Sequence, residues 1–161
     1  MSIIEFHDLT KADKPLLDRY FQSRYYENSH FTFTNLFMWR EPYQVKWCEE
    51  DGVLYMTCQW EGQLMALQPY GPEEKIQEAT EKFLAYFEQQ GKPFAMTSVE
   101  KSYAQVLENF AGASFVIEAD RDNFDYVYLA EKLISLSGRK LHSKKNHLNA
   151  FHKLYPQAEY L

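Results

Sequence analysis

The chain has 161 residues, of which 45% are hydrophobic and 17% aromatic, and its formal net charge is −6. This length suits one domain, and the apolar content is sufficient for a packed core, which excludes a disordered chain. Residues 139–153 contribute +5, so the remainder carries −11, and this asymmetry argues against a general DNA or other nucleic-acid binder.

No apolar run approaches ~18 residues, and the first ten residues contain acids instead of a basic segment. The sequence therefore predicts neither a transmembrane segment nor a signal peptide. Cys48 and Cys58 lie on two runs typical of neighbouring hairpin strands, more than ~10 Å apart. A disulfide needs Cα atoms within about 7 Å, so we expect free thiols and a cytoplasmic protein.

Caps, prolines and glycines mark the boundaries of the predicted elements. A short strand at 3–6 precedes a helix at 13–26, which has Asp13 as N-cap and Pro15 in its first turn. A second helix, at 32–40, is stopped by Pro42. Strands are then predicted at 43–49, 53–60 and 63–68, joined by two tight turns that each contain glycine.

The remaining elements are the central helix and the segments after it. The central helix occupies 71–91, between Pro72 and Gly91. After it we expect a strand at 93–99, a helix at 100–112, and two strands at 114–119 and 122–130. A short helix at 130–138 and a basic helix at 140–155 complete the predicted elements. The order β-αα-βββ-α-β-α-ββ plus C-terminal helix predicts an α+β fold, with a mixed, mostly antiparallel sheet flanked by helices.

This order resembles the GNAT acyltransferase fold over residues 1–130, with a helical tail at 131–161. GNAT members that bind acyl-CoA carry a loop of the form R/Q-x-x-G-x-G/A before the central helix, where backbone N–H groups hold the diphosphate. Gln68 and Gly71 match it as candidate cofactor-binding residues. Pro72, however, lacks an N–H, and the two glutamates that follow it would repel phosphate by about 1–4 kcal/mol. We therefore expect a degenerate loop and no cofactor bound to this chain.

Catalytic and metal-binding candidates are few. Tyr126 and Tyr128 lie on the last predicted strand, where the GNAT fold often supplies a tyrosine acid, and they are the catalytic candidates. His142, His147 and His152 recur every five residues, which turns each by about 140° from the last on a helix. They cannot share one metal ion, so no metal site is predicted.

The basic helix is the candidate anion-binding element. Leu141, Leu148, Phe151 and Tyr155 form one face of it, which we expect to be covered by a partner surface. Its candidate anion-binding residues are Lys140, Lys144, Lys145 and His147. An anionic lipid head group, tRNA or a nucleotide would each supply phosphate. The alternative is a docked surface helix whose lysines are only solvated.

Two stretches, 32–40 and 138–151, resemble the signatures of a bacterial family similar to the C-terminal domain of phosphatidylglycerol lysyltransferase. The resemblance implies two GNAT-like halves in tandem, the first with a degenerate loop and the second after the basic helix. The related lysyltransferases move an aminoacyl group from charged tRNA to a lipid. The signature positions matched here, whose roles the resemblance does not give, are Trp39, Arg40, Lys140, His142, Lys144, Lys145, Asn146 and His147.

Three functions stay open at this stage. The chain is the N-terminal half of a lysyltransferase-related protein, scaffold and cleft wall for acyl or aminoacyl transfer, whose partner is a second GNAT-like half or a second copy. Alternatively, it is a stand-alone N-acyltransferase that uses acyl-CoA, or a non-enzymatic module that docks through its basic helix. Acyl-CoA or aminoacyl-tRNA would serve the complete protein. A lipid partner would place the cytoplasmic protein at the membrane periphery.

Overall fold

The computed structural model describes residues 4–23, 28–111 and 113–159. The chain divides into two compact units, Met1–Asp125 and Tyr126–Leu161. The second unit has six Lys or Arg residues and two acids, a net +4, which leaves −10 on the first unit. The two units therefore carry charge of opposite sign.

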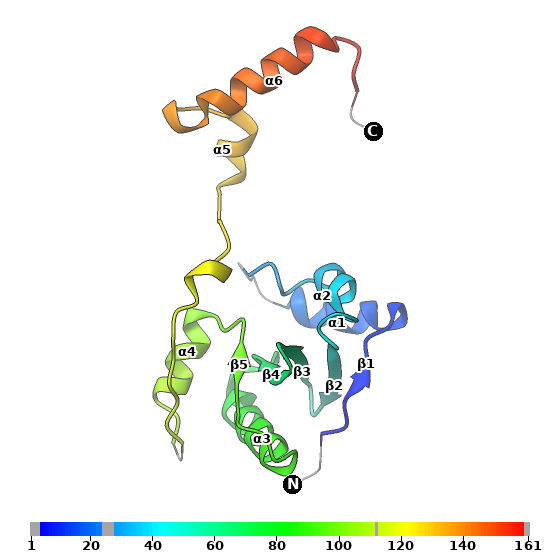
Figure 1. Cartoon of the computed structure of the whole chain (residues 1–161), viewed down its shortest axis with the longest axis vertical. Helices are drawn as coiled ribbons and strands as arrows, with labels where there is room; N and C mark the ends of the chain where they lie inside the picture. The colour runs from blue at the N-terminus through cyan, green and yellow to red at the C-terminus, as the bar shows by residue number, and fades with distance from the viewer. Residues whose placement is uncertain (1–3, 24–27, 112, 160–161) are drawn as a thin grey trace. The chain divides into compact units, whose positions relative to one another are not determined.

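The described part of the first unit contains a five-stranded mixed sheet (Figure 1). Its strands are β1 (His7–Asp8), β2 (Lys46–Glu50), β3 (Val53–Trp60), β4 (Gln63–Leu67) and β5 (Met96–Thr97). Neighbours in the order β1-β2-β3-β4-β5 run antiparallel, except that β4 and β5 are parallel. The predicted α+β class and the mixed, mostly antiparallel sheet are confirmed.

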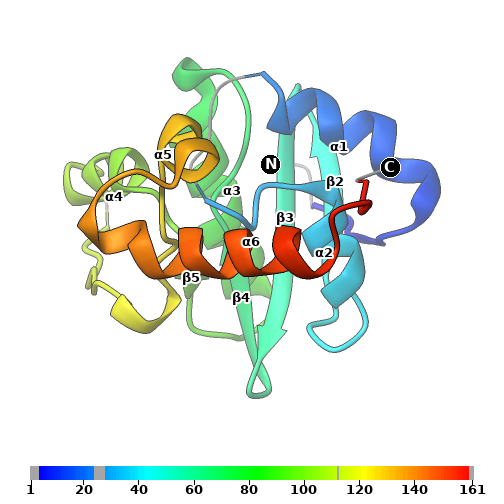
Figure 2. The same ribbon diagram turned by 90° about the horizontal axis from the view of Figure 1, so that it is seen from above.

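Two tight turns fix the register of the three central strands, which lie side by side in Figure 2. Asp51 and Gly52 join β2 to β3, and both have positive φ angles, 53° and 74°. Glu61 and Gly62 join β3 to β4 in the same way, with φ angles of 50° and 79°. Two consecutive residues of positive φ match the right-handed twist of a hairpin. Glycine at the second position of each turn therefore places both hairpins where the sequence predicts them.

Helices cover both faces of the sheet because β3 is apolar on both faces. Leu54 and Met56 join the core cluster that includes residues of α1 (Lys14–Phe21) and α2 (Phe33–Trp39). Val53 and Tyr55 alternate with them and join the cluster that includes residues of α3 (Ile76–Gln89). Successive side chains of a strand point to opposite faces, so one strand connects two hydrophobic layers. The short helix η2 (Glu73–Lys75) leads directly into α3, and α4 (Lys101–Glu108) follows β5.

The early elements are shorter than predicted. The strand predicted at 3–6 is wrong for the described residues 4–6, because β1 occupies His7–Asp8 instead, and β2 begins at Lys46 instead of residue 43. Gln44 has a φ of 45°, and the Val45 N–H donates to the carbonyl of Arg40 at 2.8 Å, so the chain is still turning there. α1 ends at Phe21, and residues 24–26 of its predicted extent lie outside the described residues.

The two strands predicted at 114–119 and 122–130 are wrong for this structure. Residues 113–120 form no ladder, a short helix η3 (Arg121–Asn123) follows, and residues 124–129 are also unpaired. Their valines and aromatic residues favour the extended conformation, but a strand exists only when its backbone groups pair with another strand. Within the described residues, neither segment pairs with another strand.

The second unit is helical. It contains α5 (Ala130–Ser135), a short helix η4 (Arg139–Leu141) and α6 (His142–Leu154), close to the two predicted helices. Leu136 adopts the left-handed conformation at the end of α5, and Gly138, with a φ of 91°, turns the chain into η4. No helix in the described part of the chain is long and apolar enough to cross a membrane.

Candidate functional site

The turn between β4 and α3 is the position at which the sequence predicts a degenerate cofactor loop. Thr57 of β3 pairs with Ala66, whereas Leu54 pairs with Tyr70 through two backbone hydrogen bonds of 2.8 and 3.0 Å. Three steps along β3 thus match four steps from Ala66 to Tyr70, so the turn begins with one extra residue, a β-bulge. The bulge includes Gln68, which therefore leaves the regular ladder.

Gln68 is fully buried, and its amide is bonded at both ends to one residue. Its Nε2 donates to the Glu100 carboxylate at 3.0 Å, and its Oε1 accepts the Glu100 backbone N–H at 2.9 Å. Glu100 is the N-cap of α4, 32 residues further along the chain. Gln68 therefore fastens the start of α4 to the end of β4, and we call this pair the Gln68–Glu100 clamp.

A second buried hydrogen bond fastens α4 to α3. The Tyr103 hydroxyl lies 2.6 Å from Thr80 Oγ1, which itself donates to the carbonyl of Ile76 at 2.8 Å. Because Thr80 has one hydroxyl proton, Tyr103 is the donor of the pair. Burial is the main cause that raises the pKa of Tyr103 to about 12, so its proton stays in place at neutral pH.

Gly71, the other predicted cofactor-binding residue, packs against the β2–β3 turn. A Cβ atom there would lie 2.9 Å from Val53 Cγ2 and 3.0 Å from the carbonyl oxygen of Gly52. The Lys75 ammonium donates to the carbonyl of Asp51 in the same turn. The glycine is explained by this close approach of two backbones, without any ligand.

Lys82 of α3 adds a second contact to the β2–β3 turn. It is buried, and its ammonium lies 3.0 Å from Asp51 and 3.2 Å from Glu50. Burial lowers the pKa of Lys82, but the hydrogen bonds that its ammonium donates to Asp51 and Glu50 outweigh burial and hold the pKa above its ordinary value. The ammonium is therefore engaged with one carboxylate at the end of β2 and one in the turn.

Few backbone N–H groups of the turn between β4 and α3 are left to bind an anion. Pro72 has no N–H, and the N–H groups of Lys75 and Ile76 donate to the carbonyls of Pro72 and Glu73. Glu73 and Glu74 are exposed and carry negative charge at the start of the helix. A diphosphate cradle needs successive free N–H groups and positive potential. The arrangement instead resembles a helix start stabilised by acids.

The catalytic candidates Tyr126 and Tyr128 are not held in a site. They lie in the unpaired stretch instead of on a strand, and their exposed fractions are 82% and 57%. Within the described residues no hydrogen bond to either hydroxyl is recorded. A general acid needs a defined position relative to its substrate, which the chain alone does not give these two residues.

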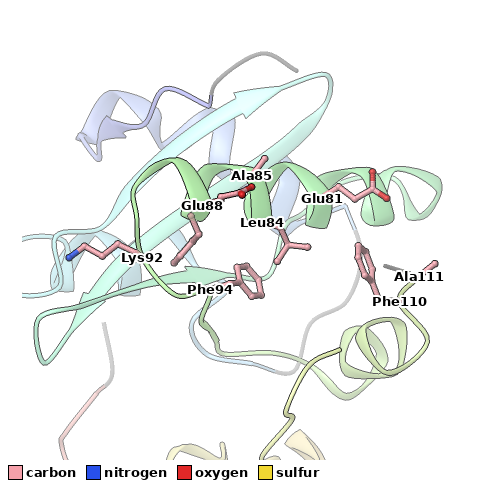
Figure 3. A pocket seen from close by; sticks show the side chains of 9 residues that line it. Glu81, Leu84, Ala85, Glu88, Lys92, Phe94, Phe110 and Ala111 are labelled. Carbon is pink, nitrogen blue, oxygen red and sulfur yellow. The ribbon is translucent and has the colours of Figure 1, made fainter. Parts of the chain in front are cut away.

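An open hollow of about 710 Å³ lies beside α3 (Figure 3). Leu84, Phe94 and Phe110 form its apolar part, and Glu81, Glu88 and Lys92 add charge. Neither histidine nor cysteine lines it, and Phe94 and Phe110 both contact the ring of Phe115, at 5.7 and 5.5 Å between centroids. The hollow offers an apolar contact surface but no paired acid and base.

The basic residues of the second unit are solvent-exposed. Lys140 lies in η4, and Lys144, Lys145 and His147 lie along α6 with His142 and Asn146. On the same helix Leu148 and Phe151 are about half exposed, and the Phe151 ring contacts Tyr155 at 5.2 Å. Lys144 is four residues before Leu148, so a positive charge lies beside the apolar side chains. This combination can contact a surface that is both anionic and apolar.

The signature residues Trp39 and Arg40 have local structural roles. The Arg40 guanidinium lies 3.9 Å from the Phe37 ring centroid and donates to the Phe37 carbonyl and to Glu41, at 2.6 and 2.7 Å. It thereby satisfies a carbonyl at the end of α2. The Trp39 ring contacts Tyr43, which stacks on Trp60 of β3.

Other reactive side chains are not arranged for catalysis. Cys48 and Cys58 are free, as predicted, and burial is the main cause that raises the pKa of both, that of Cys58 to about 11. Thiols of this kind are poor nucleophiles at neutral pH. In the part of the chain that the structure describes, no group of three or more His, Cys, Asp or Glu residues is placed to hold a metal ion.

Comparison with known proteins gives a family and one solved relative. The family described as "Phosphatidylglycerol lysyltransferase, C-terminal" matches residues 23–160. A crystal structure of a conserved protein of unknown function from Bacteroides thetaiotaomicron VPI-5482 matches with a TM-score of 0.89 and 28% identity. The match covers 99% of this chain and 53% of that one, so the chain spans about half the length of the relative. Functionally curated proteins gave no significant match.

The Gln68–Glu100 clamp leads to a stability prediction. Gln68→Met keeps the volume but leaves the Glu100 N–H without its partner, so we expect the free energy of unfolding to fall by about 1–3 kcal/mol. Gln63→Met, at the exposed start of the same strand, is the matched control and should change it by less than about 0.5 kcal/mol. Urea denaturation measures both, and equal effects of the two substitutions would show that the clamp adds nothing.

Proposed function

We propose that this chain is the N-terminal of two GNAT-like halves of a transferase-related protein, because it belongs to the phosphatidylglycerol lysyltransferase C-terminal family. In this proposal the chain supplies scaffold and one wall of a cleft for acyl or aminoacyl transfer. The main catalytic groups belong to the second half.

The observation that carries the proposal is the relation between the two chain lengths. The solved relative shares this fold over 99% of the present chain, yet the match occupies only 53% of the relative. The remainder of the relative is large enough for one more domain of similar size. A two-half organisation accounts for this without any change in the fold of the present chain.

The site geometry supports a scaffold role over catalysis by this chain alone. The two residues that match the cofactor motif are engaged elsewhere, Gln68 with Glu100 and Gly71 with the β2–β3 turn. The candidate tyrosines are exposed and unpositioned. Acyl transfer requires a base near the attacking amine and donors for the developing oxyanion. A stand-alone acyl-CoA enzyme is therefore the weaker alternative.

We further propose that α6 and η4 contact phosphate in the complete protein. The second unit carries a net +4 while the first carries −10, so positive charge is concentrated on these helices. Charged tRNA and an anionic lipid would both supply phosphate, and lysines bind it as point charges. In this proposal the acceptor or donor of the transfer is held by electrostatic contacts before reaction.

The two-half proposal predicts an activity difference. We expect the encoding reading frame to continue by about 130–150 residues, roughly one domain. The complete protein should transfer an aminoacyl group from charged tRNA to phosphatidylglycerol vesicles, measured as labelled lipid, whereas the 161-residue chain should not. A reading frame that ends with this chain, or equal transfer by the chain alone, would contradict the proposal.

The phosphate proposal predicts salt-dependent binding. The double substitution Lys144→Gln and Lys145→Gln should weaken binding to tRNA or to phosphatidylglycerol vesicles by on the order of tenfold or more. It should also reduce the slope of log affinity against log salt by about 1–2. The control replaces Lys11 and Lys92, two exposed lysines of the first unit, in the same way.

The two probes separate the possible sources of phosphate, because the double substitution should weaken binding to one of them and leave binding to the other unchanged. Equal effects of the test and control pairs, or binding that does not change with salt, would refute a specific role of α6.

A further inference from the structure

Residues 126–129 form an extended stretch whose backbone is unpaired. No hydrogen bond within the described residues is recorded for the N–H groups of Tyr126, Val127, Tyr128 or Leu129. The four side chains are exposed, with fractions of 82%, 59%, 57% and 65%. Four consecutive large apolar or aromatic residues in water are unusual for a folded chain, because exposed contiguous apolar surface normally marks an interaction site.

Hydrogen bonds flank the stretch on each side. Just before it, the Asp125 carboxylate accepts the backbone N–H of Ser29 at 2.8 Å. At its end, the Leu129 carbonyl accepts the N–H groups of Lys132 and Leu133, at 3.0 and 3.3 Å, in the first turn of α5. Phe124, two residues before the stretch, and Leu129, its last residue, are both extended, with ψ angles of 132° and 129°. A segment that is already extended loses less entropy on pairing than a flexible one.

The residue types indicate a strand that is buried on both faces. Valine and tyrosine are among the residues that strands favour. Tyr126 and Tyr128 would point to one face of a sheet, and Val127 and Leu129 to the other. A strand that is apolar on both faces belongs inside a covered sheet and not at a solvated edge. The missing component is therefore a sheet edge with apolar layers on both sides of it.

We infer that residues 126–129 are a docking strand that adds to the edge of a β-sheet in the second half of the complete protein. The inference rests on the proposed two-half organisation and names the surface through which the halves join. Addition of a strand to a sheet edge pairs the backbone groups and buries alternate side chains in one step. A partner half of this kind is favoured because the solved relative keeps this fold and has nearly as much additional chain.

Hydrogen exchange tests the docking strand directly. Peptides that cover residues 124–131 are compared between the 161-residue chain and the complete protein by mass spectrometry. We expect exchange in the complete protein to slow by about 100-fold or more, because paired N–H groups exchange only after opening. Peptides of β3 should be protected in both proteins, which controls for folding of the first unit.

Two substitutions at one position separate backbone pairing from side-chain burial. Val127→Pro removes the N–H donor and cannot join the inside of a sheet, whereas Val127→Thr keeps the donor and the strand preference. In the complete protein, Val127→Pro should abolish protection of residues 124–131 and Val127→Thr should keep most of it. In the isolated chain both should leave the protection of β3 unchanged, which excludes misfolding as the cause.

The outcomes distinguish this inference from the two-half proposal. Rapid exchange of residues 124–131 in a longer, active protein would overturn the docking strand and leave the proposed function intact. Protection in the isolated chain that rises with its concentration would assign the partner as a second copy and also overturn the inference. Equal protection in Val127→Pro and Val127→Thr would show burial without strand pairing.

Discussion

The double hydrogen bond between Gln68 and Glu100 determines how the chain is arranged at the end of β4, where the sheet meets the start of α4. It joins the bulge after β4 to the N-cap residue of α4, and the Gln68 side chain that makes it is fully buried. A buried amide must have partners at both ends, so the clamp fixes the rotamer of Gln68 and the start of α4 together. The turn that follows is then free to pack against the β2–β3 hairpin through Gly71 and Lys75. Contacts within the chain thus engage the groups that the sequence motif suggested for a cofactor.

Charge separation between the two units gives the chain its second distinctive property. The first unit is strongly acidic, and its buried Lys82 is surrounded by the carboxylates of Glu50, Asp51 and Glu78. The second unit is basic, with lysines beside exposed apolar residues on α6. A surface that is both basic and apolar, such as that of α6, binds anions in a salt-dependent way, and its apolar residues are normally covered by a partner. Both properties fit the proposal that this chain is one part of a larger assembly.

The sequence predicts the first unit well where the signals are local. The glycines at 52 and 62 determine the hairpins, and the alternation in β3 determines which helices cover each face. The clamp could not be predicted, because Gln68 and Glu100 are separated by 32 residues and only the fold brings them together. The strands expected at 114–119 and 122–130 fail for the opposite reason. Their local preference is genuine, but neither segment pairs with another strand among the described residues.

The measurement that most directly tests the central claim is calorimetric titration of the chain with coenzyme A, followed by a crystal structure of the mixture. Because the turn after β4 is engaged by Glu100 and the β2–β3 hairpin, we expect no binding heat at millimolar ligand and no diphosphate at the turn. Saturable binding, with the diphosphate seated on the backbone amides around Gly71, would contradict this assignment of the turn.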